Sequence, residues 1–153
     1  MRSRRGMFRA AMGVVALGLA FAAPSRADLS AARAEQNLEK RSRLALQNAA
    51  AALKAARTAY NKSDDAQVAS ATAEIQESVD LAYDSLKQTG KNPRSHPKYF
   101  KQAEIDTRDL LRRLDSFQQE MSYLDRPTLD KVKARIQQVH DDLLLGLMEG
   151  KRK

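Results

Sequence analysis

The sequence predicts an all-α protein, an antiparallel four-helix bundle with up-down-up-down connections. Beyond residue 28, apolar residues recur at alternating steps of three and four, which places them on one stripe of a helix. No stretch there alternates apolar and polar residues for the length of a strand. Short connections make successive long helices antiparallel, and four apolar stripes can close one core. The alternative is two long hairpins that bury their stripes against a second copy, so a monomer and a homodimer both stay open.

The first two helices are expected at residues 29–61 and 65–89. The first is rich in alanine, leucine, arginine, lysine and glutamate, which are strong helix formers. The polar run 63–65 supplies an N-cap and early negative charge for the second helix, and Gly90 suits its C-terminal cap. Residues before about Asn37 are expected to overhang this hairpin or to cover the loop before the third helix. The stripes are Leu46, Ala49, Leu53, Ala56 and Tyr60, then Val68, Ala71, Ile75, Val79, Ala82 and Leu86.

The third and fourth helices are expected at residues 97–124 and 127–149. Pro97 suits a first helical turn, where its missing N–H costs nothing. Residues 125–127 are interpreted as a tight stop and restart. The basic tail 150–153 is expected to fray. The stripes are Ala103, Thr107, Leu110, Leu114, Phe117, Met121 and Leu124, then Leu129, Val132, Ile136, Val139, Leu143 and Gly146 or Leu147.

The two halves of the chain correspond at an offset of 61 residues. Residues 49–88 and 110–149 align without a gap and share seven identical positions of 40. Both turns fall at the same offset. The match indicates either a duplicated helical hairpin or the register that any two hairpins with heptad stripes share.

Residues 1–27 predict a cleaved export signal. A short basic start precedes about 14 apolar residues, fewer than the roughly 20 that span a bilayer, and small residues stand at Ser25 and Ala27. The run 3–8 also resembles a twin-arginine signal, so both the Sec and the twin-arginine route stay open. The mature chain is expected to begin at Asp28, to contain no membrane span, and to be periplasmic or secreted by a bacterium.

Charge and composition exclude several classes of protein. The formal net charge is +8, but residues 1–27 hold five arginines and no acid, and residues 151–153 add three more positive charges. The folded part is therefore nearly neutral, which argues against a nucleic-acid partner. The absence of cysteine excludes disulfides and thiolate metal sites. No nucleophile–base pair and no glycine-rich phosphate loop is recognised, so the protein is predicted not to be an enzyme.

His140 is the candidate metal or haem ligand on a predicted helix. It lies one position beyond the stripe of the fourth helix and is followed by two aspartates. The other interpretation is a boundary histidine with its ring against Ile136 and Leu144 and one nitrogen in water. Di-iron bundles are excluded because no Glu-x-x-His occurs. A haem would need a second ligand, for which His96 and Met121 are the candidates.

The run 27–29, Ala-Asp-Leu, resembles the start of the mature chain in small periplasmic b-type cytochromes, which are also exported four-helix bundles. The resemblance implies a haem with a methionine ligand in the first helix. Residues 29–61 contain no methionine and carry Arg33 or its neighbours where that ligand would stand. No cofactor is therefore expected, and a small periplasmic bundle that carries a cofactor or metal is the alternative function.

The segment 91–101 is the most distinctive candidate contact surface. It is basic, no acid interrupts it, and it holds the longest break between helices. Phe100 continues an apolar face, whereas Tyr99 is expected to be exposed. The expected function is contact with a partner protein or an anionic component of the envelope; a merely solvated loop is the other interpretation. The candidate contact residues are Lys91, Arg94, His96, Lys98, Tyr99 and Lys101.

Overall fold

The computed structural model describes residues 28–149 and confirms the all-α bundle, with no strand in that range. The expected export signal at 1–27 and the basic tail at 150–153 lie outside the described residues. Between residues 28 and 149, no helix is long and apolar enough to cross a membrane. The elements are α1 (Ser30–Ala34), α2 (Leu38–Asn61), α3 (Asp65–Gln88), α4 (Pro97–Glu120), the 3-10 turn η1 (Arg126–Leu129) and α5 (Asp130–Glu149).

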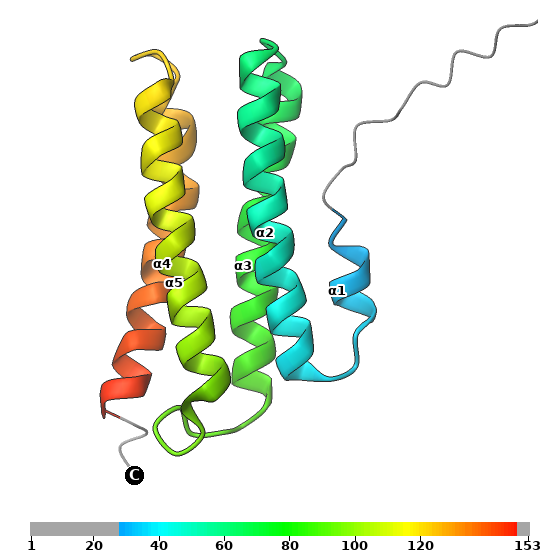
Figure 1. The fold of residues 1–153 in the computed structure, drawn as a ribbon, viewed down its shortest axis with the longest axis vertical. Helices are drawn as coiled ribbons and strands as arrows, with labels where there is room; N and C mark the ends of the chain where they lie inside the picture. Colours follow the sequence, from blue (N-terminus) through cyan, green and yellow to red (C-terminus); the bar gives the residue numbers. More distant parts are fainter. Residues whose placement is uncertain (1–27, 150–153) are drawn as a thin grey trace, which may run out of the picture.

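The four long helices form two antiparallel hairpins, α2–α3 and α4–α5, and chain direction alternates as expected (Figure 1). Inter-helix contacts place α2 beside α4 and α3 beside α5, whereas α3 and α4 touch less. The neighbours across the two hairpins are therefore parallel pairs. The connection 89–96 crosses the end of the bundle diagonally, from α3 to α4 (Figure 1).

The core lies between the hairpins and is built from the predicted stripes. Large side chains from all four long helices are at most 2% exposed, among them Leu53, Ile75, Leu114, Phe117 and Ile136. The α2–α3 hairpin is packed through small residues, since Ala45, Ala52 and Ala59 recur every seven residues and are at most 5% exposed. Asn48, on the same side of α2, donates hydrogen bonds to Glu74 and Ser78 of α3 (2.8 and 3.0 Å). Small side chains here allow two backbones to approach closely.

The single helix expected over 29–61 is interrupted at residues 35–37. The Asn37 side chain accepts a hydrogen bond from the Lys40 amide (2.9 Å), which caps α2, and the Glu35 carboxylate accepts one from the Asn37 amide (3.0 Å). These local bonds compete with helix continuation. The chain therefore turns back, and α1 lies beside α2 with Leu29 and Ala32 buried (Figure 1). The expected overhang is wrong.

The third helix ends four residues earlier than expected. Glu120 is the last residue of α4, and Met121 is extended yet buried. Leu124 was expected in the apolar stripe but is 85% exposed. The chain restarts through η1, and Pro127 suits this first helical turn because its missing N–H needs no partner there.

At the offset of 61 residues, the core positions of the two hairpins correspond. The polar contacts made by corresponding residues differ. Glu74 bonds Asn48 within its own hairpin, whereas its counterpart Arg135 pairs with Asp80 of the other hairpin (2.7 Å). The core stripes coincide because both hairpins face the same core with the same heptad spacing. Duplication stays a hypothesis.

Candidate functional site

The basic segment 91–101 lies at the end of the bundle where α3 passes to α4. Gly90 has a φ of +66°, which lets the chain leave α3 sharply. The Asn92 side chain accepts a hydrogen bond from the Arg94 amide (2.9 Å), and the Asn92 carbonyl accepts one from the His96 amide (2.9 Å). The segment is thus an ordered turn, and α4 begins at Pro97 as expected. Five of the six candidate contact residues are exposed: Lys91, Arg94, His96, Lys98 and Lys101.

Two of the candidate contact residues are less available than expected. Lys91 Nζ lies 2.5 Å from Glu39 Oε1 of α2, so its charge is paired. Tyr99 was expected to be exposed but is half-buried and packs against the core. Lys98 Nζ lies 5.3 Å from the centre of the Tyr99 ring, a cation–π contact. Among residues 28–149, the exposed cations of the segment that form no ion pair are therefore Arg94, Lys98 and Lys101.

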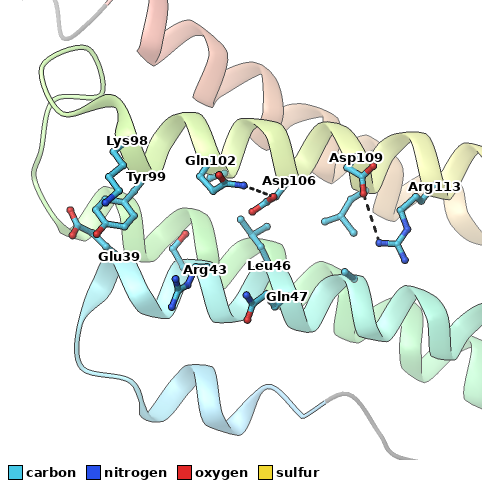
Figure 2. A pocket seen from close by; sticks show the side chains of 14 residues that line it. Glu39, Arg43, Leu46, Gln47, Lys98, Tyr99, Gln102, Asp106, Asp109 and Arg113 are labelled. Carbon is cyan, nitrogen blue, oxygen red and sulfur yellow. Dashed lines mark hydrogen bonds and ion pairs between the residues drawn. The ribbon is translucent and has the colours of Figure 1, made fainter.

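A groove of about 370 Å³ runs between α2 and α4 and begins at the basic segment (Figure 2). Its volume lies in the range of ligand-binding clefts. Tyr99 and Lys98 form its loop end, which links the sequence-predicted segment to a concave surface. The apolar lining comes from both helices: Leu46, Ala50, Ala103 and Leu110.

Charge changes sign along this groove. Arg43 and Lys98 stand near the loop end together with Glu39, whose charge is paired with Lys91. Asp106 lies farther along α4 and reaches toward Leu46 (Figure 2). Beyond it, Asp109 lies 3.8 Å from Arg113. Among residues 28–149, neither Arg43 nor Asp106 has an oppositely charged group within 4 Å. The groove thus offers a cationic end and an anionic middle to one elongated ligand.

Asp106 is the most perturbed charge of the groove. Burial raises the pKa of its carboxyl; the hydrogen bond donated by Gln102 (2.9 Å) opposes that rise, and the neighbouring Asp109 adds to it. The ionised carboxylate is therefore partly desolvated without a compensating cation. A ligand cation placed here would relieve that cost. Asp106 and Arg43 were missed by sequence reasoning, because each looks like an ordinary charge on a solvated helix face.

A second hollow, of about 380 Å³, is lined by residues of the connection 89–96, α3 and α5 and by Phe100 of α4. Tyr83 Oη donates a hydrogen bond to Asp142 Oδ2 (3.2 Å), and burial raises the pKa of this phenol. A methyl group on Gly146 would lie 3.2 Å from the Pro93 ring, so the connection sits close against α5. Phe100 is buried beneath it, as expected. These contacts hold the basic segment in place.

His140 reaches from α5 to α4. Its Nδ1 lies 3.3 Å from Thr107 Oγ1 and 3.8 Å from Glu104 Oε1, and its side chain is 12% exposed. The Thr107 hydroxyl also lies 2.9 Å from the Ala103 and Glu104 carbonyls, and so it links the His140 ring to the backbone of α4. The buried Glu104 was missed by sequence reasoning.

The two proposed haem partners of His140 are not brought to it. His140 contacts α4 at Glu104 and Thr107. Met121 follows Thr107 by 14 residues, which corresponds to about 20 Å along the helix axis. His96 caps the start of α4, about 12 Å away in the other direction. Two ligands of one iron must lie on either side of the same atom, so these pairs do not fit a haem. Within 28–149, no three His, Asp or Glu side chains gather as metal ligands would.

Comparison of the chain with models of protein families, with curated proteins and with solved structures finds no match.

Proposed function

We propose that this protein is an exported, non-catalytic helical bundle that binds a partner protein. The observation that carries the proposal is the groove between α2 and α4, which joins the exposed cations of segment 91–101 to an apolar floor and the partly buried Asp106. Such a groove suits an extended segment of the partner. Loops and clefts at the end of a rigid scaffold carry binding more often than its packed faces do.

The charges of the groove define the segment that it would accept. An acidic group of the partner would lie at the loop end, near Lys98 and Arg43, and a basic group would lie near Asp106, about two helical turns along α4 from Lys98. Apolar side chains between them would cover Leu46 and Leu110. The exposed Arg94 and Lys101 would steer the acidic end toward the groove, an effect that salt weakens over about 8–10 Å.

The test compares two triple charge reversals with the same change in net charge. Lys91 is left intact because it pairs with Glu39. The control changes exposed lysines elsewhere on the bundle, none of which forms an ion pair within residues 28–149. The test variant is R94E, K98E and K101E, and the control variant is K54E, K62E and K131E.

The measurement is affinity capture from an envelope extract at low and at physiological salt, with identification of the bound material. We expect the wild type and the control variant to capture one protein, and the test variant to lose it. Capture of lipid or an acidic polymer, or equal capture by both variants, would contradict the proposal. N-terminal sequencing of the recovered wild type should begin at Asp28; a start at Met1 would contradict cleavage and export by this signal.

A further inference from the structure

The last turns of α5 carry a cluster of exposed apolar side chains, at the same end of the bundle as the connection 89–96 (Figure 1). Leu144, Leu145 and Met148 are 41%, 53% and 70% exposed. Six large apolar side chains are exposed among residues 28–149, and these three lie within five residues of one helix. We call them the α5 stripe. Scattered exposed apolar residues are ordinary, whereas a cluster of them is typical of a surface that another molecule covers.

The α5 stripe cannot enter the groove of its own copy. Helix α5 packs against α3 and α4. The α4 residue that meets His140 of α5 is Glu104, whereas the groove is lined by Asp106. Two residues turn a helix by about 200°, so these are opposite sides of α4. Within residues 28–149, both the stripe and the groove are therefore left uncovered.

The charges around the α5 stripe match those of the groove in order and in spacing. Asp141 precedes the stripe by one turn, is exposed and forms no ion pair within residues 28–149. Residues 151–153 are all basic and follow Asp141 by ten to twelve positions. In the groove, Asp106 and Asp109 follow Lys98 by eight and eleven positions. The groove thus offers cation, apolar floor and acid, and the end of α5 offers acid, apolar stripe and cation.

The remaining acids at the end of α5 do not reverse this order. Asp142 accepts a hydrogen bond from Tyr83 of α3 (3.2 Å), on another side of the helix. Glu149 offsets one of the three basic charges that follow it, so residues 149–153 keep a formal charge of +2.

We propose that the α5 stripe of one copy docks in the groove of a second copy, so that the protein binds itself. The inference rests on the proposed function of the groove and names its partner. Asp141 would approach Lys98, and the stripe would cover the apolar floor. Residues 151–153 would supply the cation that Asp106 lacks. A second copy is favoured over an unrelated protein because every molecule carries both complementary surfaces.

The first experiment measures self-association by sedimentation velocity of the full chain, purified from its native envelope, over a series of concentrations. We expect the wild type to associate as its concentration rises, and less so at high salt. Leu145→Ser should raise the dissociation constant by about tenfold or more, as the loss of an interface anchor does. The matched control is Leu124→Ser, which removes a more exposed leucine at the other end of the bundle and should associate like the wild type.

Charge reversal tests the orientation of the docked helix. Lys98→Glu and Asp141→Lys should each raise the dissociation constant by about tenfold or more, because like charges then face each other. The chain that carries both substitutions should regain association, since opposite charges meet again. Both residues are exposed, and circular dichroism would check that each variant keeps its helices.

The second experiment uses the absence of native cysteine. A tagged chain with Met148→Cys is mixed with an untagged chain with Gln47→Cys, a position that lines the groove. We expect a disulfide-linked pair of one tagged and one untagged copy. The control replaces Met148→Cys by Ala134→Cys, which is exposed on α5 fourteen residues earlier and should give no such pair.

Three results would overturn the inference: a wild type that stays monomeric at millimolar concentration, a doubly reversed chain that stays dissociated, or equal trapping from position 134. If the wild type stays monomeric but affinity capture still isolates another protein, the function proposed for the groove stands and its partner is not a second copy. If the wild type binds neither itself nor another protein, both proposals fail.

Discussion

At the scale of single residues, Asp106 makes a pH-dependent prediction. Burial raises the pKa of its carboxyl in the folded protein, so ionisation costs stability above that pKa, and the cost is lost as the pH falls through the ordinary range of aspartate. Asp106→Asn removes the charge and keeps an oxygen for Gln102. We expect it to stabilise the protein at pH 7 by less than about 1 kcal/mol, because the group is partly solvated, and to have no effect below about pH 3.5.

Asp141→Asn is the matched control for this prediction. Asp141 accepts from Gln137, four residues earlier on the same helix (2.8 Å), as Asp106 does from Gln102, but it is exposed. Urea unfolding of both variants at the two pH values measures the difference. Equal behaviour of the two variants would show that the groove does not desolvate Asp106.

Features of the candidate site could be predicted from the sequence only where residues close together in the chain determine them. The cluster of cations in segment 91–101 and the start of α4 at Pro97 follow from the sequence. The pairing of Lys91 with Glu39 spans 52 residues, and the contact of His140 with Glu104 depends on the rotation of two helices about their axes. Heptad spacing alone predicts neither the Lys91–Glu39 pair nor the His140–Glu104 contact.

At the scale of elements, the close packing of α2 and α3 predicts a sharp difference between two adjacent alanines. Ala52 is fully buried, whereas Ala51 is exposed. Ala52→Leu should destabilise the protein by about 1–3 kcal/mol, because the added atoms must separate the two helices. Ala51→Leu should change stability by no more than about 0.5 kcal/mol. Chemical denaturation followed by circular dichroism measures both, and similar midpoints would show that the hairpin tolerates a wider spacing.

Helix stripes were predicted well, and helix ends were predicted less well. The stripes follow from the spacing of apolar residues, and the residues so spaced are the ones buried in the core. The break at 35–37 depends on Glu35 and Asn37, whose side chains bond backbone amides in place of the helix. The end of α4 depends on Tyr60, whose hydroxyl holds Ser122 and Asp125 from another helix. The apolar spacing of α4 therefore continues to Leu124, although the helix itself ends at Glu120.

At the scale of the whole molecule, the sequence predicts one core but not which helices lie beside each other. A stripe tells which side of a helix faces the core. It does not tell whether α4 or α5 lies next to α2. In the structure, α2 lies beside the parallel helix α4. The groove forms between these two helices, and charged residues of both helices line it. The groove therefore could not be predicted from sequence.

Each hairpin joins helices that are neighbours along the chain, and a single eight-residue connection links the two hairpins. Such low contact order predicts folding within microseconds to milliseconds, which stopped-flow refolding of residues 28–153 would measure. A ribosome adding about 5–20 residues per second needs roughly 8–30 s for the 153 residues of this chain. The α2–α3 hairpin would then close while the rest is still being synthesised. Export as an unfolded chain requires that something hold it open, whereas a twin-arginine route imposes no such demand.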